Sequence, residues 1–113
     1  MMKTYILVNR VPIPTDDIDA WNKNLLQTRS IKYTEFGDRI VVSTVFLGLD
    51  HSNRHSKNTG PVLFETMVFG SKYDDYQERY QTYDDAVLGH DRICEMVDEV
   101  RINRDNKLND LGI

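Results

Sequence analysis

Five side chains in this sequence are capable of acid–base or metal chemistry. They are Asp50, His51, His55, Glu65 and His90. Carboxylates and imidazoles exchange protons near neutral pH once their surroundings adjust their pKa values, and both groups bind divalent metals. The sequence shows no glycine-rich phosphate loop, zinc-ligand framework or nucleophile motif beside them. Any chemistry therefore depends on whether the fold brings these side chains together.

Glu65 and His90 are predicted to be neighbours in the core. Residues 41–49 and 61–69 are rich in β-branched and aromatic side chains, which is typical of strands. The expected pairing of these strands places Glu65 opposite Phe46, on the face that collects most of the apolar side chains. His90 is the polar residue on the inward stripe of a later helix. The two side chains should therefore point toward each other.

This pair has two interpretations. The favoured one is structural, a buried hydrogen bond or ion pair, because buried polar groups need partners. The alternative makes Glu65 a general acid or base with a raised pKa, with His90 as its partner and with Asp50 and His51 completing a small hydrolytic or metal-assisted enzyme. Glu65 and Asp50 are expected to lie about 10 to 13 Å apart along the strand, so they do not share one metal ion directly.

The loop that follows the first long strand carries two histidines. His51 and His55 have the H-x-x-x-H spacing of some metal sites, but that spacing joins two imidazoles only on a helix. The alternative for Asp50 and His51 is a strand-ending turn in which the aspartate accepts hydrogen bonds from nearby backbone amides. We expect the turn, and keep His51 and His55 as a weak metal candidate.

The sequence that precedes the long apolar segments predicts two strands and a helix. A strand over 5–11 should end at the prolines of residues 12–14, which remove backbone donors. A helix over about 16–27 follows, with aspartates at its start. The next strand, 31–36, leads into the long strands through a turn at Gly37-Asp38.

The second helix is the clearest local prediction. Thr82 is a good N-cap with Asp85 three residues later. The inward stripe consists of Ala86, Val87, His90, Ile93, Cys94, Val97 and Val100. Residues 70–81 show no decisive pattern, and 103–113 are expected to form a flexible tail. The fold class that follows is α+β, one domain over 1–113 with a small, mainly antiparallel sheet of three to four strands packed with two helices.

Composition narrows the classes of partner. The formal net charge is −4 and the pI is about 5.2, which argues against nucleic acid, because phosphate binding needs a concentrated basic surface. No apolar stretch is long enough for a membrane helix, and the first residues lack a secretory cleavage pattern. Cys94 is the single cysteine, which suits a reducing compartment. We expect a cytoplasmic protein without a cofactor.

Two surfaces are candidates for interactions. The sheet face away from Glu65 is predicted to be too apolar for free solvent, so an element of the chain or a second copy should cover it, with cover from within the chain slightly favoured. Self-association as a homodimer is expected through the sheet or the second helix. An acidic, tyrosine-bearing stretch offers a further contact region, formed by Tyr73, Asp74, Asp75, Tyr76, Tyr80 and Tyr83.

Three segments carry a resemblance to a known group of proteins. They are VSTVFLGLDH at 42–51, LFETMVFG at 63–70, and RYQTYDDA at 79–86 followed by Gly89-His90. The chain resembles a family of small uncharacterised proteins of bacteriophages and prophage-bearing bacteria. The resemblance implies a phage-type setting and no particular activity. The leading hypothesis is therefore a non-enzymatic accessory protein that binds a host or phage protein or a small ligand, with the small enzyme as the alternative.

Overall fold

A computed structural model of the chain describes residues 3–37, 39–52 and 60–110. It has two helices and two antiparallel sheets, which confirms the predicted α+β class. In chain order the elements are β1 (Tyr5–Val8), β2 (Val11–Pro14), α1 (Ile18–Thr28), β3 (Ser30–Phe36), β4 (Ile40–Phe46), β5 (Phe64–Phe69), β6 (Gln77–Tyr80) and α2 (Tyr83–Asp110).

The N-terminal strands form a separate two-stranded hairpin. β1 pairs with β2 through a turn at Asn9 and Arg10, whose φ angles of 48° and 70° lie in the left-handed region. The prediction that a strand ends before Pro12 is wrong, because Pro12 and Pro14 lie inside β2. Among the described strands, β2 pairs only with β1. The outer edge of β2 therefore makes no hydrogen bonds to another strand, and prolines without an N–H group can lie there without loss of such a bond.

The four-stranded sheet is a meander in the order β3-β4-β5-β6. Its antiparallel pairing is the one expected, but the register between β4 and β5 differs by one residue. Glu65 lies opposite Val45, and Phe46 lies opposite Phe64. Because side chains alternate between the faces of a strand, this shift turns every β5 side chain to the face opposite to the expected one.

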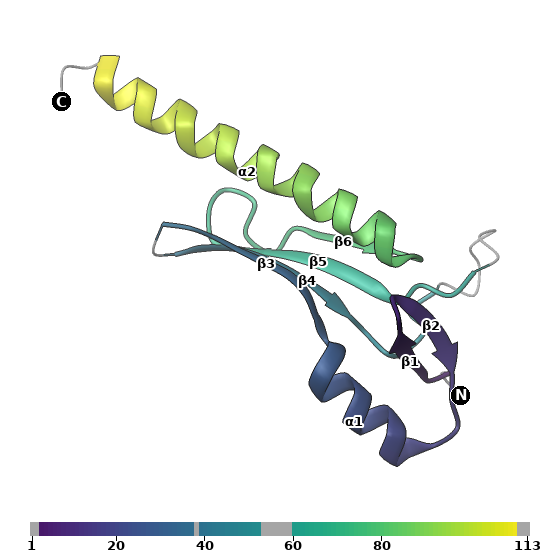
Figure 1. Ribbon diagram of the computed structural model, residues 1–113. Coiled ribbons are helices and arrows are strands. Elements are labelled where there is room, and N and C mark those ends of the chain that lie inside the picture. The colour runs from purple at the N-terminus through teal and green to yellow at the C-terminus, as the bar shows by residue number, and fades with distance from the viewer. Residues whose placement is uncertain (1–2, 38, 53–59, 111–113) are drawn as a thin grey trace.

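The helix α2 covers one face of this sheet (Figure 1). As predicted, Thr82 caps it, with its Oγ1 accepting from the Asp85 amide at 3.1 Å. Its buried stripe packs on the inward side chains of β4 and β5, and the fully buried residues of this layer are Val42, Thr44, Phe46, Phe64, Thr66, Val68, Ala86, His90, Ile93 and Val97. Val100 lies outside the residues whose side chains are described.

The end of α2 runs past the sheet (Figure 1). Residues 103–110, expected to belong to a flexible tail, continue the helix to Asp110, while 111–113 lie outside the described residues. A helix of 28 residues is about 42 Å long at 1.5 Å per residue, whereas a seven-residue strand spans about 23 Å. The overhang gives the molecule its longest extent of 61 Å.

The helix α1 packs beside β1 and the end of β4, not across the sheet. Asp17 is its N-cap, one residue after the predicted start, and accepts from the Ala20 amide at 3.1 Å. Asn24 binds the free edge of β1, with its side chain accepting from Leu7 N at 2.8 Å and donating to Leu7 O at 3.0 Å. The Trp21 indole donates to Gly48 O at 3.0 Å.

A side chain at Gly48 would collide with this helix. Gly48 has a φ of +72°, and a Cβ there would lie 2.8 Å from Leu25 and 2.9 Å from the Trp21 ring nitrogen. Glycine is therefore needed at this position both for its positive φ and for the close approach of α1. Among the described residues, no helix is long and apolar enough to cross a membrane.

Candidate functional site

Glu65 and His90 do not meet, so the predicted pairing is wrong. The one-residue shift of register turns Glu65 to the sheet face away from α2, where its Oε2 lies 2.9 Å from Arg79 Nε. The Glu65 side chain is 15% exposed and the Arg79 side chain 43% exposed. An ion pair with one partly exposed member stabilises a fold by about 0 to 1 kcal/mol. Glu65 is therefore a partly buried residue of the open face, in an ion pair with Arg79 on β6.

His90 is instead part of a chain of hydroxyl groups. Its Nε2 lies 2.9 Å from Thr34 Oγ1 and its Nδ1 lies 2.7 Å from Thr44 Oγ1. Thr44 Oγ1 is 2.5 Å from Thr66 Oγ1, which accepts the Tyr80 hydroxyl at 3.1 Å. Three strands, β3, β4 and β5, thus present a threonine to this chain, and β6 contributes the tyrosine.

The Tyr80 hydroxyl donates to Thr66, while in the Thr66–Thr44 and Thr44–His90 contacts either atom can be the donor. One consistent order continues from Thr66 to Thr44, from Thr44 to His90 Nδ1, and from His90 Nε2–H to Thr34. This order belongs to a neutral imidazole protonated at Nε2.

Burial lowers the pKa of His90, and the nearby Lys32 charge lowers it further. Lys32 is held at the rim of the helix by Asp91, with an Nζ to Oδ1 distance of 2.5 Å. His90 itself is fully buried. A general base must reach its substrate, so the structure supports the structural interpretation of His90, with threonine hydroxyls in place of Glu65 as partners.

Asp50 and His51 stabilise the end of a strand connection. The Asp50 carboxylate accepts from Ser52 N at 2.8 Å and from Val62 N at 3.0 Å. Burial raises the pKa of Asp50, but these hydrogen bonds outweigh burial and bring it below its ordinary value. The backbone of His51 donates to Val62 O at 2.9 Å. This is the turn that the sequence favoured.

The metal candidate of the sequence, His51 with His55, includes one residue that the structure does not describe. His55 lies outside the described residues. Within the described ranges, no group of three or more His, Cys, Asp or Glu side chains is placed to hold a metal ion.

The predicted tyrosine-bearing contact region is divided between core and surface. Tyr80 is only 8% exposed and belongs to the core, where its ring packs on the α2 backbone at Gly89. Tyr83 is half-buried against the part of the core that includes Phe64, and Tyr73 is half-buried against the part that includes Val68. Tyr76 is 38% exposed. Asp74 accepts from Gly70 N at 2.7 Å and so closes the 70–75 turn, and Asp75 is exposed.

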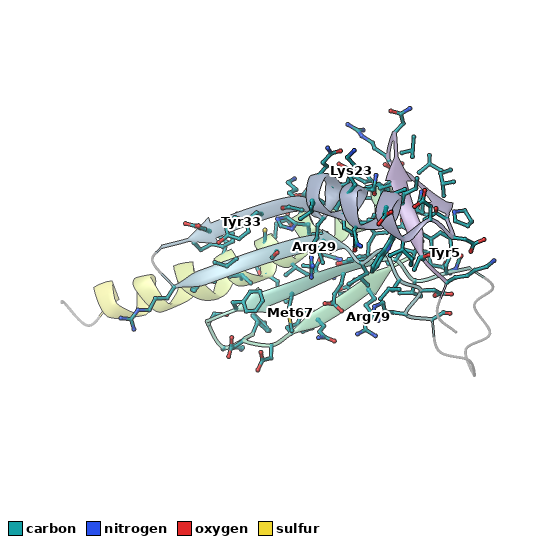
Figure 2. The ribbon with its side chains drawn as sticks, turned by 90° about the horizontal axis from the view of Figure 1, so that it is seen from below. Tyr5, Lys23, Arg29, Tyr33, Met67 and Arg79 are labelled. Atoms are coloured by element: carbon teal, nitrogen blue, oxygen red, sulfur yellow. The ribbon has the colours of Figure 1, made fainter. Side chains whose placement is uncertain are left out.

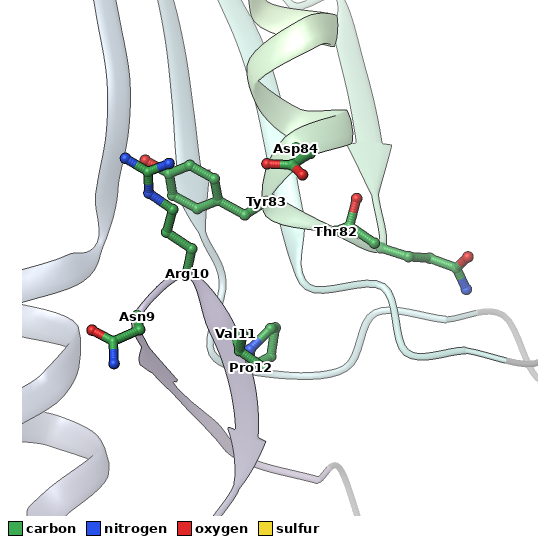
Figure 3. A pocket seen from close by; sticks show the side chains of 8 residues that line it. Asn9, Arg10, Val11, Pro12, Thr82, Tyr83 and Asp84 are labelled. Carbon is green, nitrogen blue, oxygen red and sulfur yellow. The ribbon is translucent and has the colours of Figure 1, made fainter.

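A groove lies where the β1–β2 turn approaches the start of α2 (Figure 3). The Arg10 guanidinium sits 5.2 Å from the centre of the Tyr83 ring. The groove has a volume of about 460 Å³, and its lining is Asn9, Arg10, Val11, Pro12, Gln81, Thr82, Tyr83 and Asp84. Sequence reasoning missed it, because it placed Asn9 and Arg10 inside or at the end of one strand and not in a turn.

The sheet face away from α2 is open along its length. Figure 2 shows this face from below, with Arg29, Tyr33, Met67 and Arg79 on it and α2 behind. Tyr33 is 55% exposed and Phe69 is 45% exposed. Of the face that was expected to need a cover, Phe64, Thr66 and Val68 are buried under α2 as a result of the register shift. Val41, Ser43 and Val45 lie instead on the face that neither described helix covers, because α1 packs on β1 and the β1–β2 hairpin lies at the end of the sheet.

Comparison of the chain with protein-family models, with curated proteins and with solved structures gives no match.

Proposed function

We propose that this chain is a non-enzymatic binding protein of phage type, which acts on a host or phage protein or on a small ligand. The observation that carries the proposal is the open face of the four-stranded sheet, which bears apolar side chains with substantial exposure. On this uncovered face Tyr33 is 55% and Phe69 is 45% exposed, and exposed aromatic side chains of this kind favour an interaction site. The phage-type setting is supported by the three sequence segments that resemble phage and prophage proteins.

The described site residues favour binding over catalysis. His90 is fully buried, Glu65 is paired with Arg79, and Asp50 accepts two backbone amides. Each of these groups has a role in stability, so none is free to act on a substrate. The proposed protein works in the cytoplasm of the host cell as a homodimer.

The groove beside Tyr83 is the proposed contact for the partner or ligand. Arg10 and Asp84 offer opposite charges on either side of an aromatic ring, next to the exposed amide of Asn9. Side chains of these types are common at protein interfaces, where Tyr and Arg are enriched. A protein segment or ligand with both polar and flat apolar groups fits this lining.

Affinity capture with matched variants tests the proposal. Tagged wild-type protein, Arg10→Ala and Lys23→Ala are used to capture ligands from host cells with and without phage infection. Lys23 is an exposed cation of α1 outside the groove, so it is the control. We expect a specific set of bound molecules that Lys23→Ala retains and Arg10→Ala loses. Equal capture by all three proteins would reject the groove, and turnover of a captured molecule would reject the non-enzymatic class.

A further inference from the structure

We propose that a second copy of this chain covers the open sheet face, related by a twofold axis that runs across the strands. This inference rests on the proposed function, in which the protein is a homodimer, and it names the surface, the symmetry and the contacts. It follows from how the printed register orders the side chains of that face.

The register arranges the open face into three rows that cross the strands. The α1-end row contains Ser30, Val45, Glu65 and Arg79; the middle row contains Tyr33, Ser43, Met67 and Gln77; the turn-end row contains Glu35, Val41 and Phe69. Along β4 the two end rows are each two residues from the middle row, about 7 Å away. On β4 and β5 the middle row therefore lies equidistant from the two ends. On β3 a bulge between Ser30 and Lys32 adds one residue on the α1 side, so Ser30 is three residues from Tyr33 and Glu35 is two.

The two end rows differ in charge. Arg29 directly precedes Ser30 and lies on this face (Figure 2), and Arg79 ends the same row in its pair with Glu65. Glu35 is exposed in the turn-end row, on the same side of β3 as Tyr33, whose pKa it raises by hydrogen bonding. On β3, one end of the open face is therefore basic at Arg29 and the other end is acidic at Glu35, with the exposed Arg39 just before β4 at the same end as Glu35.

A twofold axis along the middle row makes this charge pattern self-complementary. It superimposes each end row on the opposite end row of the partner, as an isologous interface requires. Arg29 then faces the partner's Glu35, and Val45 faces the partner's Val41. Met67 lies on the axis and meets its own copy. Sheets packed face to face in this way are about 10 Å apart, with apolar side chains between them.

The position of α1 agrees with this arrangement. The helix stands on the open side of the sheet, beyond the α1-end row (Figure 1). Its Leu26 is 89% exposed and lines a surface groove with Asn22, Leu25 and Arg29. The twofold axis brings the partner's turn-end row toward this groove. The second copy therefore accounts for an exposed leucine that no described element of the same chain covers.

Charge exchange tests the proposal in solution. Sedimentation measures the mass of wild type, Arg29→Glu, Glu35→Arg, the double variant and an equimolar mixture of the two single variants. Each single variant places like charges opposite each other at both symmetric contacts, so it should dissociate at least tenfold more readily than wild type. In the mixture, both contacts join opposite charges, and a heterodimer should form. The double variant should dimerise as wild type does.

Two controls separate folding from association. Circular dichroism and melting temperature show that each variant is folded, and Glu95→Lys, at an exposed position of α2, should leave the dimer intact. Met67→Lys places two cations on the axis and should give a folded monomer. If Arg29→Glu and Glu35→Arg dissociate no more readily than wild type, this interface is refuted, while self-association through another surface is not. A wild-type monomer at high micromolar concentration would overturn it too, without affecting the capture of partners through Arg10.

Discussion

Gly89→Ala measures how tightly α2 is packed on the sheet. Alanine is favoured over glycine inside a helix by about 1 kcal/mol, so helix propensity alone predicts stabilisation. The structure predicts the opposite, because a Cβ at residue 89 would lie 2.3 Å from both Cε1 and the hydroxyl oxygen of Tyr80. Tyr80 is 8% exposed and its hydroxyl donates to Thr66, so its ring has no free space to enter.

The net change in the free energy of unfolding follows from these contacts. Overpacking a filled core costs about 1 to 3 kcal/mol, and displacing the Tyr80 hydroxyl from Thr66 costs about 1 to 3 kcal/mol when the group stays buried. After subtraction of the helix gain, Gly89→Ala should lower the free energy of unfolding by about 1 to 5 kcal/mol, and the melting temperature by about 4 °C or more.

A double-mutant cycle with Tyr80→Leu identifies the cause. Leucine lacks the ring tip that a Cβ would strike, so Gly89→Ala in the Tyr80→Leu background should be neutral or should stabilise by up to about 1 kcal/mol. Urea unfolding of the four proteins supplies the cycle. If Gly89→Ala raises stability in the wild-type background, or if it has the same effect in both backgrounds, the close contact with Tyr80 is refuted.

Three further predictions concern the polar residues singled out by the sequence. Because the pKa of His90 is lowered in the fold, the unfolded chain takes up this proton first. Stability is therefore complete above the unfolded value of about 6.5 and is lost as pH falls below it, and His90→Gln should flatten that part of the stability profile. Asp50→Ala leaves the amides of Ser52 and Val62 without their acceptor and should cost about 1 to 3 kcal/mol in urea unfolding; an unchanged midpoint would show that water replaces the carboxylate fully. Glu65→Gln removes only the charge that faces the partly exposed Arg79 guanidinium and should shift the free energy of unfolding by less than about 1 kcal/mol, whereas a loss of several kcal/mol would show that the ion pair is essential to the fold.

Local patterns in the sequence were sufficient for the start and the buried stripe of α2 and for the order of β3, β4 and β5. The Thr82 cap and the stripe Ala86, His90, Ile93 and Val97 are properties of one continuous segment, and both are confirmed. The antiparallel meander follows from the shortness of its connections, since parallel pairing needs a long crossover. The β1–β2 hairpin was missed because its turn uses Asn9 and Arg10 at positive φ, where glycine is the usual signal.

The register of β5 depends on contacts that no single segment encodes. Residues 63–69 read Leu-Phe-Glu-Thr-Met-Val-Phe, so both alternating sets of side chains contain apolar groups and either set is an acceptable core face. The polar residues decide between them. Thr66 inward meets Thr44 and Tyr80 and completes the hydrogen bonds of His90, while Glu65 inward would bury a carboxylate and separate it from Arg79, its partner on the open face. A buried charge without a partner costs more than a hydroxyl that is fully hydrogen-bonded. The cost of burying Glu65 therefore selects the register, and the register in turn creates the open face with opposite charges at its two ends.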